Sequence, residues 1–244
     1  GTGLAEVLFG DTDPAGRLTQ TWYRSVTDLP DLLDYDIIGN DMTYLYYRGR
    51  PLYPFGHGCG YTTFGYTDLE LRTAAAGAAG GTAVAGADDA VTARVTVTNT
   101  GTRPGVEVVQ LYGRQRTSSV KRPLRQLLGF QRVRLAPGEQ TTVNISFPVT
   151  ALATWDVTRD RPVVEPASHQ IMIGRSATDI VAAAPLTVLG EPIPPRAALT
   201  GRLRAADHDG QAGTTLVAET LERGDAVAAV EPDGWVAFLH TDLG

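Results

Sequence analysis

Residues 90–113 read AVTARVTVTNTGTRPGVEVVQLYG, and the fold class follows from this stretch. In its first half, valine alternates with threonine and arginine, which is typical of a β-strand with one buried face. TGTRPG then supplies the glycine and proline of a turn, and VEVVQLYG has the composition of a second strand. The stretch therefore predicts two consecutive strands joined by a turn.

The same pattern continues on both sides of this stretch. Upstream, YTTFGYTDLEL (61–71) alternates in the same way, and downstream further strand-like segments cover 127–135, 141–149, 154–164 and 169–176. Short strands at regular spacing predict a mainly β chain, with about seven strands in an immunoglobulin or fibronectin type III-like β-sandwich over residues 67–190. The expected core residues are Val95, Val97, Val108, Leu111, Phe130, Val133, Val143, Ile145, Ile171 and Ile173.

The segment before the sandwich has a different character. LAEVLFG (4–10) predicts a short helix ended by a glycine, and LTQTWY (18–23) predicts a short strand. The chain has no initiating Met and begins with Gly1-Thr2-Gly3 directly before this apolar pattern. We therefore expect residues 1–66 to be the end of a larger domain that is cut at Gly1.

Three further segments complete the predicted organisation. Residues 74–89, rich in Ala and Gly, predict a loop, and residues 191–205 predict a proline-rich linker. Residues 206–244 carry short strands and turns but are too few for an independent sandwich. We expect a truncated β-module there, with Trp235 and Phe238 partly exposed.

The composition excludes some classes of partner and site. The chain of 244 residues has 21 Lys and Arg against 27 Asp and Glu, which argues against nucleic acid as a partner. It has no apolar run long enough for a membrane span. Cys59 is the single cysteine, and the four histidines are scattered, so we expect no internal disulfide, no metal site and no cofactor. The compartment stays open, with an extracellular location favoured over a cytoplasmic one.

Two carboxylate pairs invite a glycosidase interpretation, since such enzymes use two carboxyl groups on either side of the scissile bond. Asp11 and Asp13 flank a turn, and Asp34 and Asp36 lie in a loop. Aspartates in such places commonly accept hydrogen bonds from nearby backbone N–H groups. We therefore expect structural roles for all four and predict no catalytic residue in this chain.

A basic group of residues lies in the loop after the second strand. Such a group could bind phosphate, but the overall excess of acidic residues favours a solvated loop or an interdomain salt-bridge surface. Its members are Arg114, Arg116, Lys121, Arg122 and Arg125.

The stretch TYLYYRGRPLYPFGHG (43–58) is unusually aromatic. Tyrosines beside arginines can stack on sugar rings, and on that interpretation Tyr46, Tyr47 and Arg48 would bind substrate. Amphipathic aromatic side chains also line boundaries between domains. Eight of the 18 aromatic residues lie between Tyr44 and Tyr66, where the loop leads into the first strand of the sandwich. This position favours a seam, that is, a contact surface between two domains. The rings expected to be substantially buried there are Tyr53, Phe55, Tyr61 and Phe64.

Several motifs resemble family 3 glycoside hydrolases, in the order in which that family has them. GTGLAEVLFGDTDPAGRLTQTW resembles the end of the family's second catalytic domain, and TYLYYRGRPLYPFGHGCGYTTF its junction into the third. VTNTGTRPGVEVVQLY, SSVKRPLRQLLGFQRVRLAPGEQTTV and IMIGRSATDI resemble its fibronectin type III-like domain. The resemblance covers about residues 1–188. One departure is Cys59-Gly60, where the family usually has Leu-Ser.

The resemblance implies the end of an α/β sandwich domain followed by the β-sandwich. It also implies a full-length parent that hydrolyses terminal β-linked sugars with retention, as a β-glucosidase or β-xylosidase, and that binds the carbohydrate substrate. In the family, the nucleophilic aspartate and the acid/base glutamate lie upstream of the segment present here, so no catalytic residue carries over. The tail is similar to the opening strands of family 6-like carbohydrate-binding modules, which are jelly-roll-like.

A competing hypothesis is a non-catalytic carbohydrate-binding or adhesion module. Residues 1–24 discriminate between the two, because a free-standing module has no use for a helix–turn–strand segment without partners. The hydrolase hypothesis explains this segment and is therefore favoured.

Overall fold

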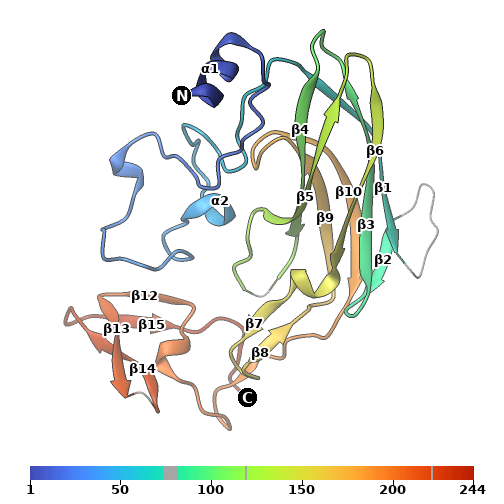
Figure 1. Cartoon of the computed structure of the whole chain (residues 1–244). Coiled ribbons are helices and arrows are strands. Elements are labelled where there is room, and N and C mark those ends of the chain that lie inside the picture. Colours follow the sequence, from blue (N-terminus) through green and yellow to red (C-terminus); the bar gives the residue numbers. More distant parts are fainter. Residues whose placement is uncertain (74–81, 119, 221) are drawn as a thin grey trace.

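The computed structural model describes residues 1–73, 82–118, 120–220 and 222–244, and it is mainly β (Figure 1). Two sheets form a sandwich. The first has three strands, in the order β1 (Phe64–Thr73), β3 (Ala90–Asn99) and β6 (Gln140–Pro148). The second has five, in the order β2 (Ala83–Gly86), β10 (Ile180–Leu189), β9 (Ala167–Gly174), β4 (Gly105–Gln115) and β5 (Gln126–Leu135).

Neighbouring strands are antiparallel except for β2, which pairs with β10 in parallel. Within the described residues the two sheets hold eight strands rather than the expected seven or so. The additional strand, β2, lies in the segment predicted as a loop; the rest of that prediction, at 74–81, falls outside the described residues. Residues 154–164 form the small hairpin of β7 (Thr154–Asp156) and β8 (Arg161–Val163).

The core lies between the two sheets, where the alternation of β3 buries its valines as the sequence predicts. Seven of the ten expected core residues are buried: Val95, Val97, Leu111, Val143, Ile145, Ile171 and Ile173. Val133 is half-buried and packs against the core.

Two core predictions are wrong. Phe130 is 66% exposed and Val108 is only half-buried. In the β4–β5 ladder Phe130 lies opposite Gln110, and residues opposite each other share a face of the sheet. Leu111 points into the core, so Val108 and Phe130 point to the outer face of the five-stranded sheet.

The N-terminal segment contains α1 (Thr2–Phe9), the 3₁₀ helix η1 (Val26–Asp28) and α2 (Thr43–Tyr46). The predicted helix stop is confirmed: Gly10 has a φ of +80° and its N–H bonds back to the helix. The predicted strand at 18–23 is reduced to a single bridge between Trp22 and Tyr53. This segment lies along one side of the sandwich, in blue in Figure 1.

The C-terminal segment is built of two-stranded ribbons, in orange to red in Figure 1. They pair β11 (Arg196–Ala197) with β16 (Thr241–Asp242), β12 (Gly210–Ala212) with β15 (Trp235–Ala237) and β13 (Thr214–Thr220) with β14 (Gly224–Ala229). The 3₁₀ helix η2 (Val149–Leu152) precedes the β7–β8 hairpin, and the 3₁₀ helix η3 (Ala205–Asp207) lies between β11 and β12.

The predicted linker at 191–205 is not only a spacer. Arg196 is buried, and its guanidinium pairs with Asp209 at 2.9 Å and lies over the Phe238 ring at 5.4 Å. Arg196, in the segment predicted as a linker, thus contacts residues of the tail. Trp235 is 52% exposed and Phe238 is half-buried, in line with the expected partial exposure of both.

Candidate functional site

The aromatic stretch folds back on itself and packs on the outer face of the five-stranded sheet. Tyr44 stacks on Phe55, with ring centroids 4.0 Å apart and planes within 14°. Tyr44 also meets Tyr112 of β4 edge-on at 6.4 Å, and Tyr112 is fully buried although it points away from the core. Met172 of β9 completes this second apolar cluster. The outer face of β4 is thus covered at this place by residues of the N-terminal segment.

Backbone hydrogen bonds hold this contact in register. The N–H of Leu124 donates to the carbonyl of Leu45 at 2.6 Å, and the N–H of Ala177 donates to the carbonyl of Phe55 at 2.9 Å. The N–H of Leu127 donates to the Tyr44 hydroxyl at 3.3 Å. Residues from two different loops of the sandwich therefore bond to one short stretch, which makes this stretch a seam.

Gly56 explains why the chain can come so close to the sheet. Its φ is +79°, and a side-chain Cβ there would lie 2.0 Å from Gln110 Oε1. Gln110 instead donates to the Gly56 carbonyl at 3.1 Å, while Tyr112 donates its hydroxyl proton to Gln110 at 2.6 Å. Gln110 and Tyr112 of β4 thus form a hydrogen-bonded pair that holds the backbone of the seam against the sheet.

A second attachment lies at the other end of the sheet. Asp13 accepts hydrogen bonds from the N–H groups of Tyr61 at 2.7 Å and Val106 at 2.8 Å. Arg17 pairs with Glu107 at 2.8 Å, and the Glu107 side chain is only 3% exposed. A buried carboxylate needs a nearby cation, so this ion pair ties the N-terminal segment to β4.

The burial predicted for four rings of the seam is correct for two. Phe64 is buried and Phe55 is half-buried, whereas Tyr53 is 43% and Tyr61 42% exposed. Tyr61 nevertheless donates its hydroxyl proton to the Val7 carbonyl at 2.6 Å. The centre of the seam is Tyr44, which the sequence analysis did not single out.

The three predicted sugar-binding residues separate in the structure. Tyr47 and Arg48 line a pocket of about 220 Å³ at the seam, and Tyr46 does not. Tyr46 lies instead beside Lys121, whose ammonium is 5.9 Å from the ring centroid, and burial raises the pKa of its hydroxyl. Lys121 in turn pairs with Asp41 at 2.9 Å, so one member of the basic loop does form an interdomain ion pair, as expected.

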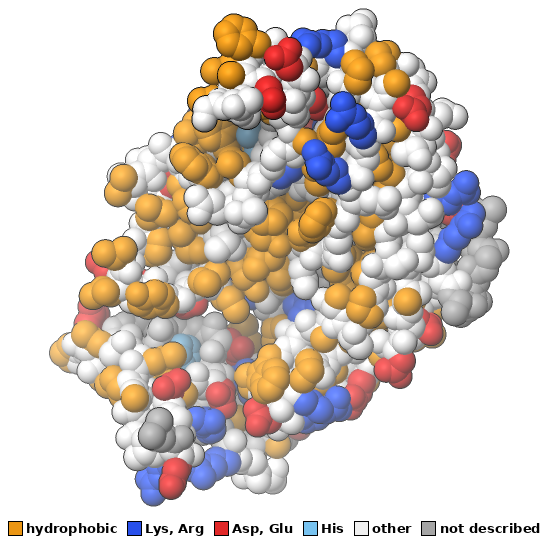
Figure 2. Space-filling model, in the orientation of Figure 1, with side chains coloured by type: hydrophobic (Ala, Val, Ile, Leu, Met, Phe, Trp, Pro, Cys, Tyr) orange, Lys and Arg blue, Asp and Glu red, His pale blue; other side chains and the backbone are white. Residues whose placement is uncertain are grey.

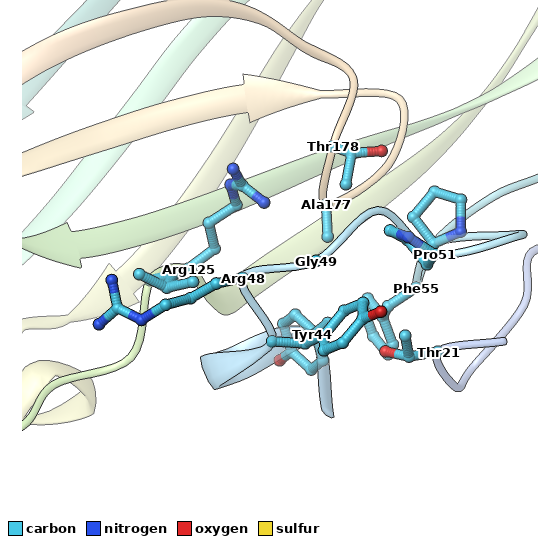
Figure 3. Close-up of a pocket in the computed structure, with 12 residues that line it drawn as sticks. Thr21, Tyr44, Arg48, Gly49, Pro51, Phe55, Arg125, Ala177 and Thr178 are labelled. Carbon is cyan, nitrogen blue, oxygen red and sulfur yellow. The ribbon is translucent and has the colours of Figure 1, made fainter. Parts of the chain in front are cut away.

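The pocket brings together residues that are far apart in the sequence (Figure 3). In this view Ala177 and Thr178, from the loop between β9 and β10, lie on one side, and Tyr44 and Phe55 lie on the opposite side. Thr21 also lines the pocket; its hydroxyl is buried and has no hydrogen-bond partner among the described residues. Aromatic faces, hydroxyls and guanidinium groups, the latter from Arg48 and Arg125, can together recognise a polar ring.

A larger groove of about 940 Å³ adjoins this pocket. Both hollows are lined by Gly49, Pro51, Pro54 and Thr178, so they meet along one edge of the seam. The groove then continues past Tyr53. Together they form a continuous concave surface along the seam.

Three of the four aspartates in the carboxylate pairs, Asp13, Asp34 and Asp36, accept hydrogen bonds from backbone N–H groups. Asp34 accepts a hydrogen bond from the N–H of Asp36 at 2.9 Å, and this bond lowers the pKa of Asp34. A proton donor for glycoside hydrolysis needs a raised pKa instead. Asp36 accepts from the Gly39 N–H at 2.7 Å, and Asp11 is exposed.

Two negative findings concern the described residues. They contain no cluster of three or more His, Cys, Asp or Glu side chains that could hold a metal ion. None of the helices they form has the length and apolar character needed to cross a membrane.

Two family models match the chain. Residues 1–61 match the glycosyl hydrolase family 3 C-terminal domain, and residues 107–177 match the fibronectin type III-like domain. The seam described above joins residues of the first matched region to residues of the second. Residues 1–61 are therefore similar to the C-terminal domain of family 3 glycosyl hydrolases, and residues 107–177 are similar to a fibronectin type III-like domain.

Known β-glycosidases are similar over the same region. The chain is 38% identical to a probable beta-glucosidase I of Aspergillus terreus, over 74% of this chain and 22% of that protein. It is 35% identical to a xylan 1,4-beta-xylosidase of Xylanibacter ruminicola, over 73% and 19%. The crystal structure of a family 3 beta-glucosidase of Bifidobacterium adolescentis superimposes with a TM-score of 0.69 at 28% identity, covering 83% of this chain and 30% of that one.

These matches define the chain as similar to the C-terminal region of β-glucosidases and β-xylosidases, which is consistent with a fragment of a β-glycosidase. The chain spans about a fifth of the length of the curated relatives it matches.

Proposed function

We propose that this chain is the C-terminal accessory part of a β-glycosidase that hydrolyses terminal β-linked sugars with retention, of the β-glucosidase or β-xylosidase type. The observation that carries the proposal is the seam, in which the end of a hydrolase domain is bonded at several points to the outer face of a fibronectin type III-like sheet. An adhesion module has no need of this attachment. The relatives named above support the class of reaction.

The N-terminal segment supports the proposal through the apolar surface it exposes. Side chains that are 67–89% exposed include Leu4, Leu8, Phe9, Leu32, Leu33 and Tyr35. Figure 2 shows hydrophobic side chains gathered on the side of the molecule where Figure 1 places this segment. A surface of this kind marks an interface, and we assign it to the upstream part of the same hydrolase domain. In that arrangement the sandwich is held to the catalytic region through the seam.

The domain boundaries follow from this assignment. Residues 1–66 are the end of the α/β sandwich domain, residues 67–190 are the fibronectin type III-like domain, and a short connection leads to the ribbons of the tail. The tail is the start of a further β-module of the jelly-roll type, for which a carbohydrate-binding role fits the exposed Trp235. The catalytic nucleophile and acid/base lie in the upstream region.

The test is an assay of the protein encoded by the complete reading frame on aryl β-glucosides and β-xylosides. We expect turnover, with the β-anomer as the first product seen by NMR. Replacing Phe55 with Ala should shift inactivation of that enzyme to lower temperature, because it opens the Tyr44 stack. The exposed Phe130→Ala is the matched control. A reading frame without a catalytic region, or a protein without turnover on these substrates, would contradict the proposal.

A further inference from the structure

The residues that line the adjoining pocket and groove include more arginines than carboxylates. Two of the arginines that line the groove are paired, Arg17 with Glu107 at 2.8 Å and Arg175 with Asp179 at 3.4 Å. These two carboxylates are the acidic residues of both linings. The remaining arginines of the linings are Arg24, Arg48, Arg50 and Arg125.

These four guanidinium groups are available to a ligand. Arg24, Arg50 and Arg125 have no carboxylate oxygen within 4 Å among the described residues, and Arg48 has one at 3.6 Å, from Asp41 in an exposed pair. Arg125 is half-buried beside Arg114, and burial followed by the charge of Arg114 lowers its pKa. The chain as a whole has a net charge of −6, so this local excess of positive charge is opposite in sign to the rest of the molecule.

Aromatic faces accompany the arginines along the cleft. Tyr44 and Phe55 form one wall of the pocket. In the groove, Tyr53 stacks on His57 at 5.1 Å. Trp22, which is not part of the lining, supports Tyr53 with an edge-on contact at 6.4 Å. Tyr53 is 43% exposed, so part of its ring is open to a ligand. Flat apolar faces beside hydrogen-bond donors suit a ring that has both apolar and polar sides.

We propose that this cleft binds an oligosaccharide that carries carboxylate groups, with one ring in the pocket and the following rings along the groove. The pocket, at about 220 Å³, is smaller than the roughly 300–1,000 Å³ typical of drug-sized ligand sites, which suits a single ring. Arginine binds carboxylates with two parallel hydrogen bonds, and both hollows contain such a side chain: Arg48 and Arg125 line the pocket, and Arg24 and Arg50 line the groove. The choice of a sugar ligand rests on the proposed function, whereas the requirement for an anion rests on the charge distribution.

The experiment is calorimetric titration of the 244-residue chain with tetragalacturonate and, for comparison, with cellotetraose, which has the same number of rings but no carboxylate. Tripolyphosphate tests whether charge alone is enough. We expect tetragalacturonate to bind, cellotetraose to bind at least tenfold more weakly, and tripolyphosphate to be a poor substitute. Raising the salt concentration should weaken the binding, because part of the cleft is open to solvent.

The variants Arg125→Gln and Arg50→Gln should each weaken tetragalacturonate binding by roughly tenfold, the value expected for one charge-assisted hydrogen bond. Arg134→Gln, on an exposed position of β5 outside the cleft, is the matched control and should leave binding unchanged. Arg50 is exposed, so its variant keeps the fold even if Arg125→Gln lowers stability. The inference is overturned if tetragalacturonate does not bind, if cellotetraose or tripolyphosphate binds equally well, or if the Arg50 and Arg134 variants behave alike. Because no turnover is measured, these outcomes are independent of the test of β-glycosidase activity.

Discussion

Replacing Arg17 with Met should destabilise the protein more than the loss of any exposed ion pair. The guanidinium lies 2.8 Å from Glu107 Oε1, and the two side chains are 16% and 3% exposed. The substitution keeps much of the apolar stem of Arg17 but leaves the Glu107 carboxylate buried without its cation. Removing one partner of a buried pair costs about 3–5 kcal/mol, and the partial exposure of Arg17 places this case near 3 kcal/mol. For a chain of this size, that lowers the Tm by roughly 6–12 °C.

The assay is thermal and urea unfolding of four proteins: the wild type, Arg17→Met, Glu107→Gln and the double variant. We expect the double variant to lose less stability than the sum of the single changes, since it has no buried charge. Arg94→Met, which removes the cation of an exposed pair with Glu70 at 3.8 Å, is the control and should cost less than about 1 kcal/mol. The reasoning would be refuted if Arg17→Met and Arg94→Met lowered the free energy of unfolding equally. It would also be refuted if the losses from Arg17→Met and Glu107→Gln simply added up in the double variant.

Three further predictions concern other parts of the fold. Gly56→Ala should lower the Tm more than Gly138→Ala. Both glycines have positive φ, but only at Gly56 would a Cβ clash with neighbouring atoms. Equal losses of Tm in a thermal melt would contradict this. Phe130→Ala should change the free energy of unfolding by less than about 0.5 kcal/mol and Ile173→Ala by about 2–5 kcal/mol, and urea denaturation giving the reverse order would show that the faces of the sheet are misassigned. Burial lowers the pKa of His169 in the folded protein below the ordinary value of 6.5. Because the unfolded chain then binds a proton at His169 more readily than the folded one, stability should fall as the pH drops below about 6.5. Melting curves between about pH 7 and pH 5 should show less of this loss in His169→Gln, and an unchanged pH dependence would exclude His169 as its source.

The sandwich could be predicted because the alternation in β3 and β6 reports one buried face directly. The error at Val108 arose because β4 is apolar on both faces, whereas Phe130 shares its face of β5 with Arg132 and Arg134. In β4, Val108 and Val109 are consecutive, and only the contact with the N-terminal segment shows why the outer face is partly covered. Likewise β2 has only four residues, all small apart from one valine, so its pairing with β10 depends on the sandwich rather than on a local signal.

The site was predicted in part. The aromatic composition of 43–58 indicated a seam, and two of the four rings expected there, Phe55 and Phe64, are substantially buried. Tyr44 was missed because a four-residue helix gives no periodicity from which its buried side could be inferred. Thr21, Arg125 and Thr178 reach the pocket from three separate segments, and a single sequence has no signal for such long-range contacts.

The most direct test of the account is the activity of this chain alone. Asp13, Asp34 and Asp36 accept hydrogen bonds from backbone N–H groups, and the proposed function assigns the nucleophile and the proton donor to the upstream region. Because these two groups together contribute many orders of magnitude in rate, the purified chain should give no turnover on aryl β-glucosides or β-xylosides, beside an active full-length enzyme. Turnover that survives repurification and is lost on mutating Asp11, Asp13, Asp34 or Asp36 would contradict the account.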